Sequence, residues 1–144
     1  LERDFYGVYC GQSALPLAPD SLYYLTNDAI ENCTVYDFQN NRAGQVYDFG
    51  RAMGKDPYEL FLSGPLSLLT MENPQAQAGR ELILFRDSFG SSIAPLLISG
   101  YSKITLVDIR YIHPDYLARF IDFEGCDVLF LYSTLVLNNS ETLK

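Results

Sequence analysis

A serine follows directly on an apolar segment of the chain, in a setting that suits a nucleophile. Residues 82–86 predict a buried strand, Asp87-Ser88 ends it, and the small residues that follow predict a turn into a helix. Ser88 would then lie at the carboxyl edge of a sheet, where substrates bind, beside helix N–H groups that can stabilise an oxyanion. Asp87 and Ser88 are equally suited to cap the helix without chemistry, and both interpretations stay open.

Polar residues also follow the next predicted strand, 104–108. Asp108 ends that strand, and Arg110 comes two residues later. Because parallel strands end at one edge of a sheet, about 4.8 Å apart, we expect both side chains near Ser88. Arg110 would either bind a substrate group or neutralise the carboxylates at this edge.

The proton of a serine nucleophile must pass to a base, and histidine is the usual one. His113 is the only histidine in the chain and is therefore the internal candidate for the base. It directly precedes Pro114 at a predicted helix start, so a surface or capping role is the alternative. One histidine without cysteines or carboxylates at ligand spacing predicts no metal site, and no cofactor is expected.

The elements that position these residues alternate between strand and helix. The pattern predicts strands at 82–86, 104–108 and 127–132 and helices at 91–99 and 114–121. Apolar strands without polar alternation are typical of a parallel sheet that is buried on both faces. We therefore predict an α/β fold with a three-layer, flavodoxin-like parallel sheet and a βαβαβ unit in 81–132. If the helices lie on opposite faces, the first strand is central and Ser88 lies at a topological switch point.

Residues 1–80 form a β-rich, aromatic half. The tetrapeptide Val-Tyr-Asp-Phe occurs at 35–38 and again at 46–49, around a turn-forming segment. This repeat predicts a β-hairpin with its aromatic side chains on one buried face, although the tyrosines could instead stack on sugars. Further strands are expected at 5–10 and 66–71, and the whole chain is expected to be one domain.

Charge and hydropathy exclude several classes of partner. The 144 residues are 48% hydrophobic and carry 18 acidic against 10 basic side chains, a net charge of -8. This charge opposes binding to nucleic acid and to anionic membranes. No apolar run approaches the roughly 20 residues that cross a bilayer, so we expect no membrane insertion. The oligomeric state is not predicted by these features.

Several ordered motifs resemble the DHHW family of bacterial proteins. They are Arg86-Asp87-Ser88-Phe89-Gly90, Pro95-Leu96-Leu97, the run from Lys103 to Tyr111, the run from Asp127 to Tyr132, and upstream Asp4-Phe5-Tyr6-Gly7 and the run from Lys55 to Gly64. This family is similar to SGNH hydrolases and to the alginate O-acetyltransferase group, which act on acyl esters of carbohydrates outside the cytoplasm. The resemblance implies an SGNH-like domain, Ser88 as nucleophile, a carbohydrate or acyl-ester ligand, and a location outside the cell or in its envelope.

The chain departs from the family pattern at three places. The Asp-His-His-Trp motif is absent, and there is no tryptophan. The chain is therefore expected to be the carboxyl-terminal part of a longer protein whose amino-terminal part carries the base. Arg86 replaces the glycine of Gly-Asp-Ser. The resemblance implies a substrate-binding position at Gly64, but Ser63-Gly64-Pro65 offers no asparagine of the kind that an SGNH oxyanion hole contains. A cell-surface module that binds a glycan or a protein without catalysis is the alternative function.

Overall fold

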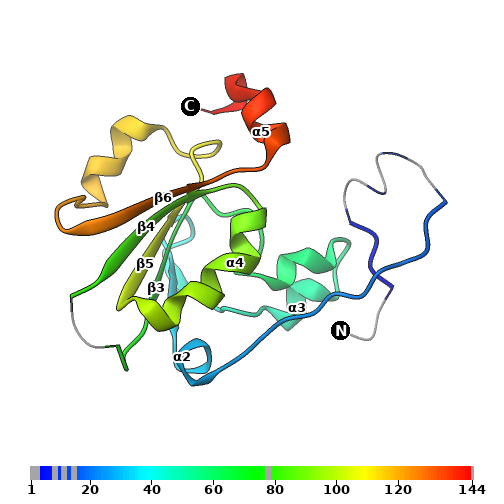
Figure 1. Ribbon diagram of the computed structural model, residues 1–144, viewed down its shortest axis with the longest axis horizontal. Coiled ribbons are helices and arrows are strands. Elements are labelled where there is room, and N and C mark those ends of the chain that lie inside the picture. Colours follow the sequence, from blue (N-terminus) through cyan, green and yellow to red (C-terminus); the bar gives the residue numbers. More distant parts are fainter. Residues whose placement is uncertain (1–3, 8–9, 11–12, 14–15, 77–78, 144) are drawn as a thin grey trace.

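A six-stranded mixed sheet organises the chain, with strand order β2-β1-β3-β5-β4-β6. The computed structural model describes residues 4–7, 10, 13, 16–76 and 79–143 (Figure 1). The strands are β1 Thr34–Asp37, β2 Arg42–Gly44, β3 Leu68–Glu72, β4 Glu81–Arg86, β5 Lys103–Val107 and β6 Cys126–Leu131. The helices are α2 Asp28–Glu31, α3 Phe49–Ala52, α4 Phe89–Leu97 and α5 Thr134–Asn138, with 3-10 helices η1 Pro57–Leu60, η2 Ile98–Gly100, η3 Pro114–Arg119 and η4 Ser140–Thr142.

The predicted parallel unit is confirmed. β4 lies between β5 and β6 and is parallel to both, with Leu84 opposite Leu106 on one side and Leu129 on the other. The chain leaves β4 through α4 to reach β5, and then crosses to β6 on the opposite side of β4. The carboxyl end of β4 is therefore the point where the strand order reverses, which is the position where α/β sheets bind ligands.

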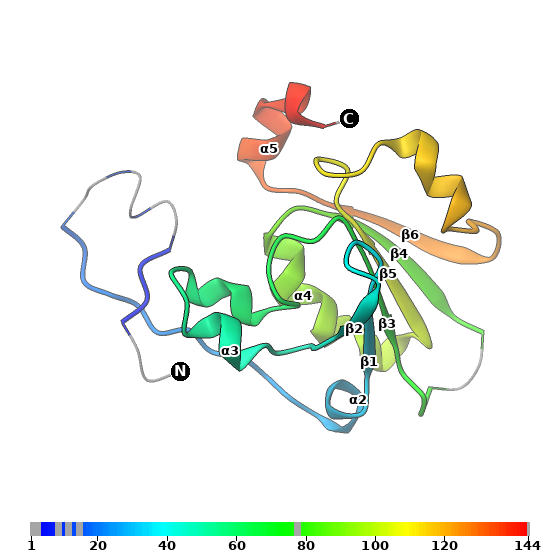
Figure 2. The same cartoon turned by 180° about the vertical axis from the view of Figure 1, so that it is seen from behind.

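Helical segments cover both faces of the sheet. Side chains on alternate strand positions, such as Leu84 and Leu106, pack with Ala94 of α4 and Ile98 of η2. The intervening positions, Ile83, Phe85 and Val107, pack against Leu117 and Ile121 on the opposite face. Figures 1 and 2 show α4 on one side of the sheet and the η3 helix, in yellow, on the other.

The antiparallel half of the sheet belongs to residues before 80. β3 pairs with β5 antiparallel, so the predicted strand at 66–71 is confirmed with a shift to 68–72. β1 pairs with both β3 and β2. The predicted hairpin exists, but its second strand is Arg42–Gly44 and not 46–49, because the turn closes directly after Asn41 at a left-handed φ of 51°.

The predicted burial of the aromatic hairpin face is wrong. In β1 the buried residues are Val35 and Asp37, whereas Tyr36 and Phe38 are each 37% exposed. Val35 joins the core beneath α4. Asp37 tolerates burial because its carboxylate accepts hydrogen bonds from the backbone and side-chain nitrogens of Asn40, at 3.0 and 2.6 Å. Turn chemistry therefore decides which face of the hairpin lies inside.

Other expectations need correction. The helix predicted at 114–121 is the 3-10 helix η3, and the helix predicted at 91–99 is α4, which begins earlier, at Phe89. β6 is not buried on both faces, since its central residues are exposed. The strand expected at 5–10 lies partly outside the described residues, and its described part forms a single bridge, Phe5 to Asp20. No helix among the described residues has the length and apolarity of a membrane span.

Candidate active site

Ser88 lies at the junction of β4 and α4, and the residue is exposed. Its backbone is helical, with φ -58° and ψ -31°, and its side chain makes no capping hydrogen bond. Within the described chain, neither its Oγ atom nor its N–H group has a hydrogen-bond partner. Ser88 therefore presents a free hydroxyl and its own amide at the switch point of the sheet, as the sequence pattern indicates.

Asp87, not Ser88, caps the helix. Its Oδ1 accepts from Phe89 N at 3.0 Å, and its Oδ2 accepts from Ser133 N, just after β6, at 2.6 Å. The residue is 1% exposed. Both carboxylate oxygens are thus engaged by backbone amides, so Asp87 fixes the turn that carries Ser88 and joins it to the chain after β6.

Arg86 supports the same turn from inside the protein. Its side chain is 0% exposed, and its guanidinium donates to Ser91 Oγ at 3.0 Å and to Leu66 O at 3.1 Å. It also lies 3.9 Å from the Asp108 carboxylate. Burial lowers the pKa of Arg86, and Asp108 opposes that effect. Arg86 is therefore an internal cross-link to three other segments of the chain.

The close packing of the Arg86 side chain requires a glycine at position 90. A Cβ atom at residue 90 would lie 2.5 Å from Arg86 Cβ, whereas a Cβ at Gly100 would meet no atom within 4 Å. We expect Gly90→Ala to lower the free energy of unfolding by about 1–3 kcal/mol, because the close-packed turn must shift. Gly100→Ala is the matched control and should stay within about 0.5 kcal/mol of the wild type. Urea unfolding of both variants measures this, and equal stabilities would contradict the close contact.

Asp108 and Arg110 form a bidentate ion pair beside Arg86. Arg110 Nε and Nη2 donate to the two oxygens of Asp108, at 2.9 and 2.7 Å. This pairing raises the pKa of Arg110. Asp108 is fully buried, whereas the Arg110 side chain is 21% exposed. Neutralisation of the carboxylate is therefore the main role that the geometry shows, and the remaining guanidinium nitrogen, Nη1, is the donor left for a ligand.

His113 is not brought to Ser88 by any contact of the described chain. It precedes η3, its Nδ1 accepts from Asp115 N at 3.3 Å, and its ring contacts Tyr116 edge-on. Its side chain is 52% exposed. These contacts are those of a capping residue on the surface.

Residues 58–64 reach the Ser88 turn through Tyr58, whereas Gly64 contacts Phe61. Leu62, Ser63 and Gly64 have left-handed φ values of 54°, 60° and 92° in succession. The N–H of Gly64 donates to Phe61 O at 3.2 Å, so it is already engaged. At the start of the segment, the Tyr58 hydroxyl donates to Ser88 O at 3.1 Å and lies 2.9 Å from Ser92 Oγ.

Two tyrosines lie near the site although the sequence does not predict their positions there. Burial is the main cause that raises the pKa of Tyr58 and of Tyr132, the latter to about 12. Tyr58 follows Asp56-Pro57, a pattern that signals a helix cap and gives no hint of a contact with residue 88. Tyr132 directly follows β6, and its buried hydroxyl has no partner among the described residues.

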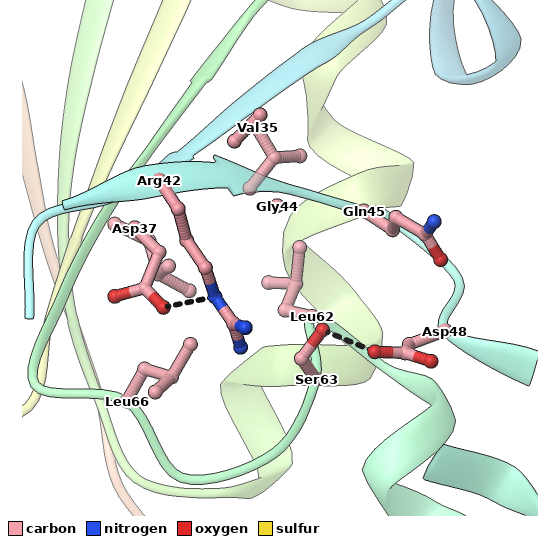
Figure 3. A pocket seen from close by; sticks show the side chains of 11 residues that line it. Val35, Asp37, Arg42, Gly44, Gln45, Asp48, Leu62, Ser63 and Leu66 are labelled. Carbon is pink, nitrogen blue, oxygen red and sulfur yellow. Dashed lines mark hydrogen bonds and ion pairs between the residues drawn. The ribbon is translucent and has the colours of Figure 1, made fainter. Parts of the chain in front are cut away.

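A small pocket lies elsewhere, between the hairpin and the turn at Ser63. Figure 3 shows the Arg42 side chain reaching from β2 into the space between Asp37 and Ser63. Arg42 pairs with Asp37 at 3.7 Å, and Ser63 Oγ donates to Asp48 at 2.8 Å. None of the predicted site residues lines this pocket, so it is distinct from the surface at Ser88. No group of three or more possible metal-ligand residues occurs in the described part of the chain.

The fold and the Ser88 turn define a mixed α/β protein with a serine displayed at the sheet edge. No protein-family model matches the chain, and a search of curated proteins found no match. Among solved structures, a DHHW family protein from Eubacterium siraeum is similar over 87% of this chain, with 26% identity and a TM-score of 0.60. Bacillus cereus PatB1 with a sulfonyl adduct is similar over 99% of this chain, with 21% identity and a TM-score of 0.65. The chain spans 43% and 46%, respectively, of the lengths of these two proteins.

Proposed function

We propose that this chain is the nucleophile-bearing part of an SGNH-like enzyme that transfers or hydrolyses acyl esters of carbohydrates outside the cytoplasm. The observation that carries the proposal is the exposed hydroxyl of Ser88 at the switch point, on a turn held by the buried Asp87 and Arg86. A nucleophile on a rigid support needs no reorganisation before attack. The neighbours support this choice, since one is a DHHW family protein and the other carries a sulfonyl adduct.

The proposed reaction uses Ser88 as follows. Its Oγ attacks the ester carbonyl carbon while its proton passes to a base, and the oxyanion accepts a hydrogen bond from the Ser88 N–H. The carbon–oxygen bond to the sugar then breaks, and the base returns the proton to the sugar oxygen. Water or a second hydroxyl takes the acyl group from Ser88 in the next step. Asp87 and Arg86 act as positioning residues, because their polar atoms bind the protein itself.

We propose that the base comes from outside the described residues. No described side chain lies within hydrogen-bond distance of Ser88 Oγ, and His113 caps η3. We assign the base to a further segment of a longer protein, as the family resemblance implies. Without the base, attack by Ser88 should be slower by about 10²–10⁴-fold.

A serine-directed fluorophosphonate probe tests the proposal. The longer native protein should be labelled, Ser88→Ala should abolish labelling, and Ser99→Ala, which removes another exposed serine, should leave it unchanged. The 144-residue chain alone should react at least about 100-fold more slowly, because it lacks the base. If the longer protein is not labelled at Ser88, the esterase proposal is wrong.

A binding module is the second candidate function. The specific observation in its favour is Arg110, whose guanidinium lies 5.3 Å from the Tyr111 ring centroid while its Nη1 stays available for a ligand. An arginine beside an exposed aromatic ring suits a polar glycan. Glycan binding that survives Ser88→Ala, in a protein that the probe does not label, would support this function.

A further inference from the structure

β6 forms one edge of the sheet, yet its surface is apolar. On one side it pairs with β4, and no other described strand pairs with it. Val128, Leu129 and Phe130 are 44%, 40% and 64% exposed. Natural edge strands are usually protected by charges, prolines or bulges, because an open apolar edge invites pairing. β6 has only Asp127 near its start and no proline.

Both faces of β6 are open, as well as its edge. Val128 and Phe130 lie opposite Ile83 and Phe85, on the η3 face, whereas Leu129 lies opposite Leu84, on the α4 face. The Phe130 ring stacks on Phe85, with centroids 4.6 Å apart and planes 9° apart, so it is held in place although it is 64% exposed. Neither helical layer extends far enough to cover this strand.

The apolar surface continues beyond β6 into α5. Leu135 and Leu137 are 47% and 54% exposed, and α5 has no buried residue. Between the two elements, the buried hydroxyl of Tyr132 lacks a partner in the described chain. We call the exposed side chains of β6 and α5 together the β6 face. Figure 1 shows both elements at the same end of the molecule, with no other strand beyond them.

We infer that the β6 face is an internal interface, covered by a parallel β-strand and a helix from the part of a longer polypeptide outside these 144 residues. The chain spans less than half of each similar structure, so enough chain exists in such proteins to form this unit. The run Val-Leu-Phe-Leu has no polar alternation and is typical of an interior parallel strand. A second copy related by a two-fold axis would pair antiparallel, which this pattern does not favour.

This interface has a consequence for the site, in a step that rests on the proposed function. The end of β6 is tied to the Ser88 turn, because Ser133 N donates to Asp87 and Asp87 N donates to Leu131 O. A strand parallel to β6 would end at the same edge, roughly 10 Å from β4. The loop after that strand is therefore where we place the missing base.

Hydrogen exchange, measured on the full-length native protein, tests the interface separately from any activity. An edge strand leaves about half of its amides unpaired, whereas an interior strand protects nearly all of them. We expect the amides of β6 to exchange at least 100-fold more slowly than those of β2, the opposite edge, and about as slowly as those of β3. Rapid exchange at alternate β6 residues would overturn the inference.

Two further measurements distinguish a segment of the same polypeptide from a second copy as the occupant of the β6 face. Phe130→Glu in the same protein should lower the melting temperature by several degrees, whereas Tyr23→Glu, which replaces a ring that is 78% exposed, should not. Equal melting temperatures would overturn the inference. Protection of β6 that appears only when the protein dimerises on concentration would assign the face to a second copy and also overturn it. These outcomes do not depend on labelling of Ser88, so the interface and the esterase proposal can fail independently.

Discussion

Arg86→Met should lower the free energy of unfolding by about 3–5 kcal/mol. The substitution removes one of the two cations beside the fully buried Asp108 carboxylate, 3.9 Å away, and leaves Arg110 as its ion-pair partner. The carbonyl of Leu66 and the hydroxyl of Ser91 also lose their donor. Urea unfolding followed by circular dichroism measures this change.

Arg80→Met provides the control for charge alone. Arg80 pairs with Asp127 at 3.1 Å, but both side chains are at least half exposed. The loss of such a pair should cost less than about 1 kcal/mol. If Arg86→Met costs no more than Arg80→Met, Arg110 alone satisfies Asp108 and the internal cross-link has no energetic weight.

Asp87→Asn should lower the free energy of unfolding by about 3 kcal/mol and loosen α5. Asparagine keeps the shape but offers one acceptor oxygen, so its NH2 group must face the amide of Phe89 or of Ser133. Hydrogen exchange of residues 133–138 should become faster together with that of the first turn of α4. Thermal unfolding and exchange on the same sample measure both effects.

Asp56→Asn is the matched control, because Asp56 also caps a helix through one oxygen, which accepts from Tyr58 N at 3.0 Å. Asparagine caps as well as aspartate, so its stability should stay within about 0.5 kcal/mol of the wild type. An Asp87→Asn protein as stable as this control would show that one of the two hydrogen bonds at Asp87 carries little energy.

The parallel unit could be predicted because local pattern and topology agree there. Residues 82–85 are all apolar, residues 104–107 contain Thr105 as their one polar residue, and one strand–helix–strand crossover places Ser88 at the edge of the sheet. The hairpin could not be predicted in detail, because Asn40 determines the burial of Asp37 through contacts that hydropathy does not encode. The alternation of aromatic residues in the hairpin predicts burial of the opposite face, which carries Tyr36 and Phe38.

The candidate site was predictable only as a set of residues. The sequence predicts that Asp108 and Arg110 lie near Ser88. It does not predict that Arg110 donates two hydrogen bonds to Asp108. The contact of Tyr58 with Ser88 joins residues 30 positions apart, and no local spacing predicts it. Arg86 is a charged residue at the end of the apolar strand β4. Only its hydrogen bonds and its ion pair explain why its burial is tolerated.

The position of β5 joins the two halves of the chain within one sheet. β5 lies between β3, from the aromatic half, and β4, from the parallel half. Its Leu106 is fully buried in a core that also contains Val35 and Met71 from the first half and Leu82 and Ile98 from the second. Because this core contains side chains from both halves, we expect residues 1–80 and 81–144 to unfold together and not as separate modules.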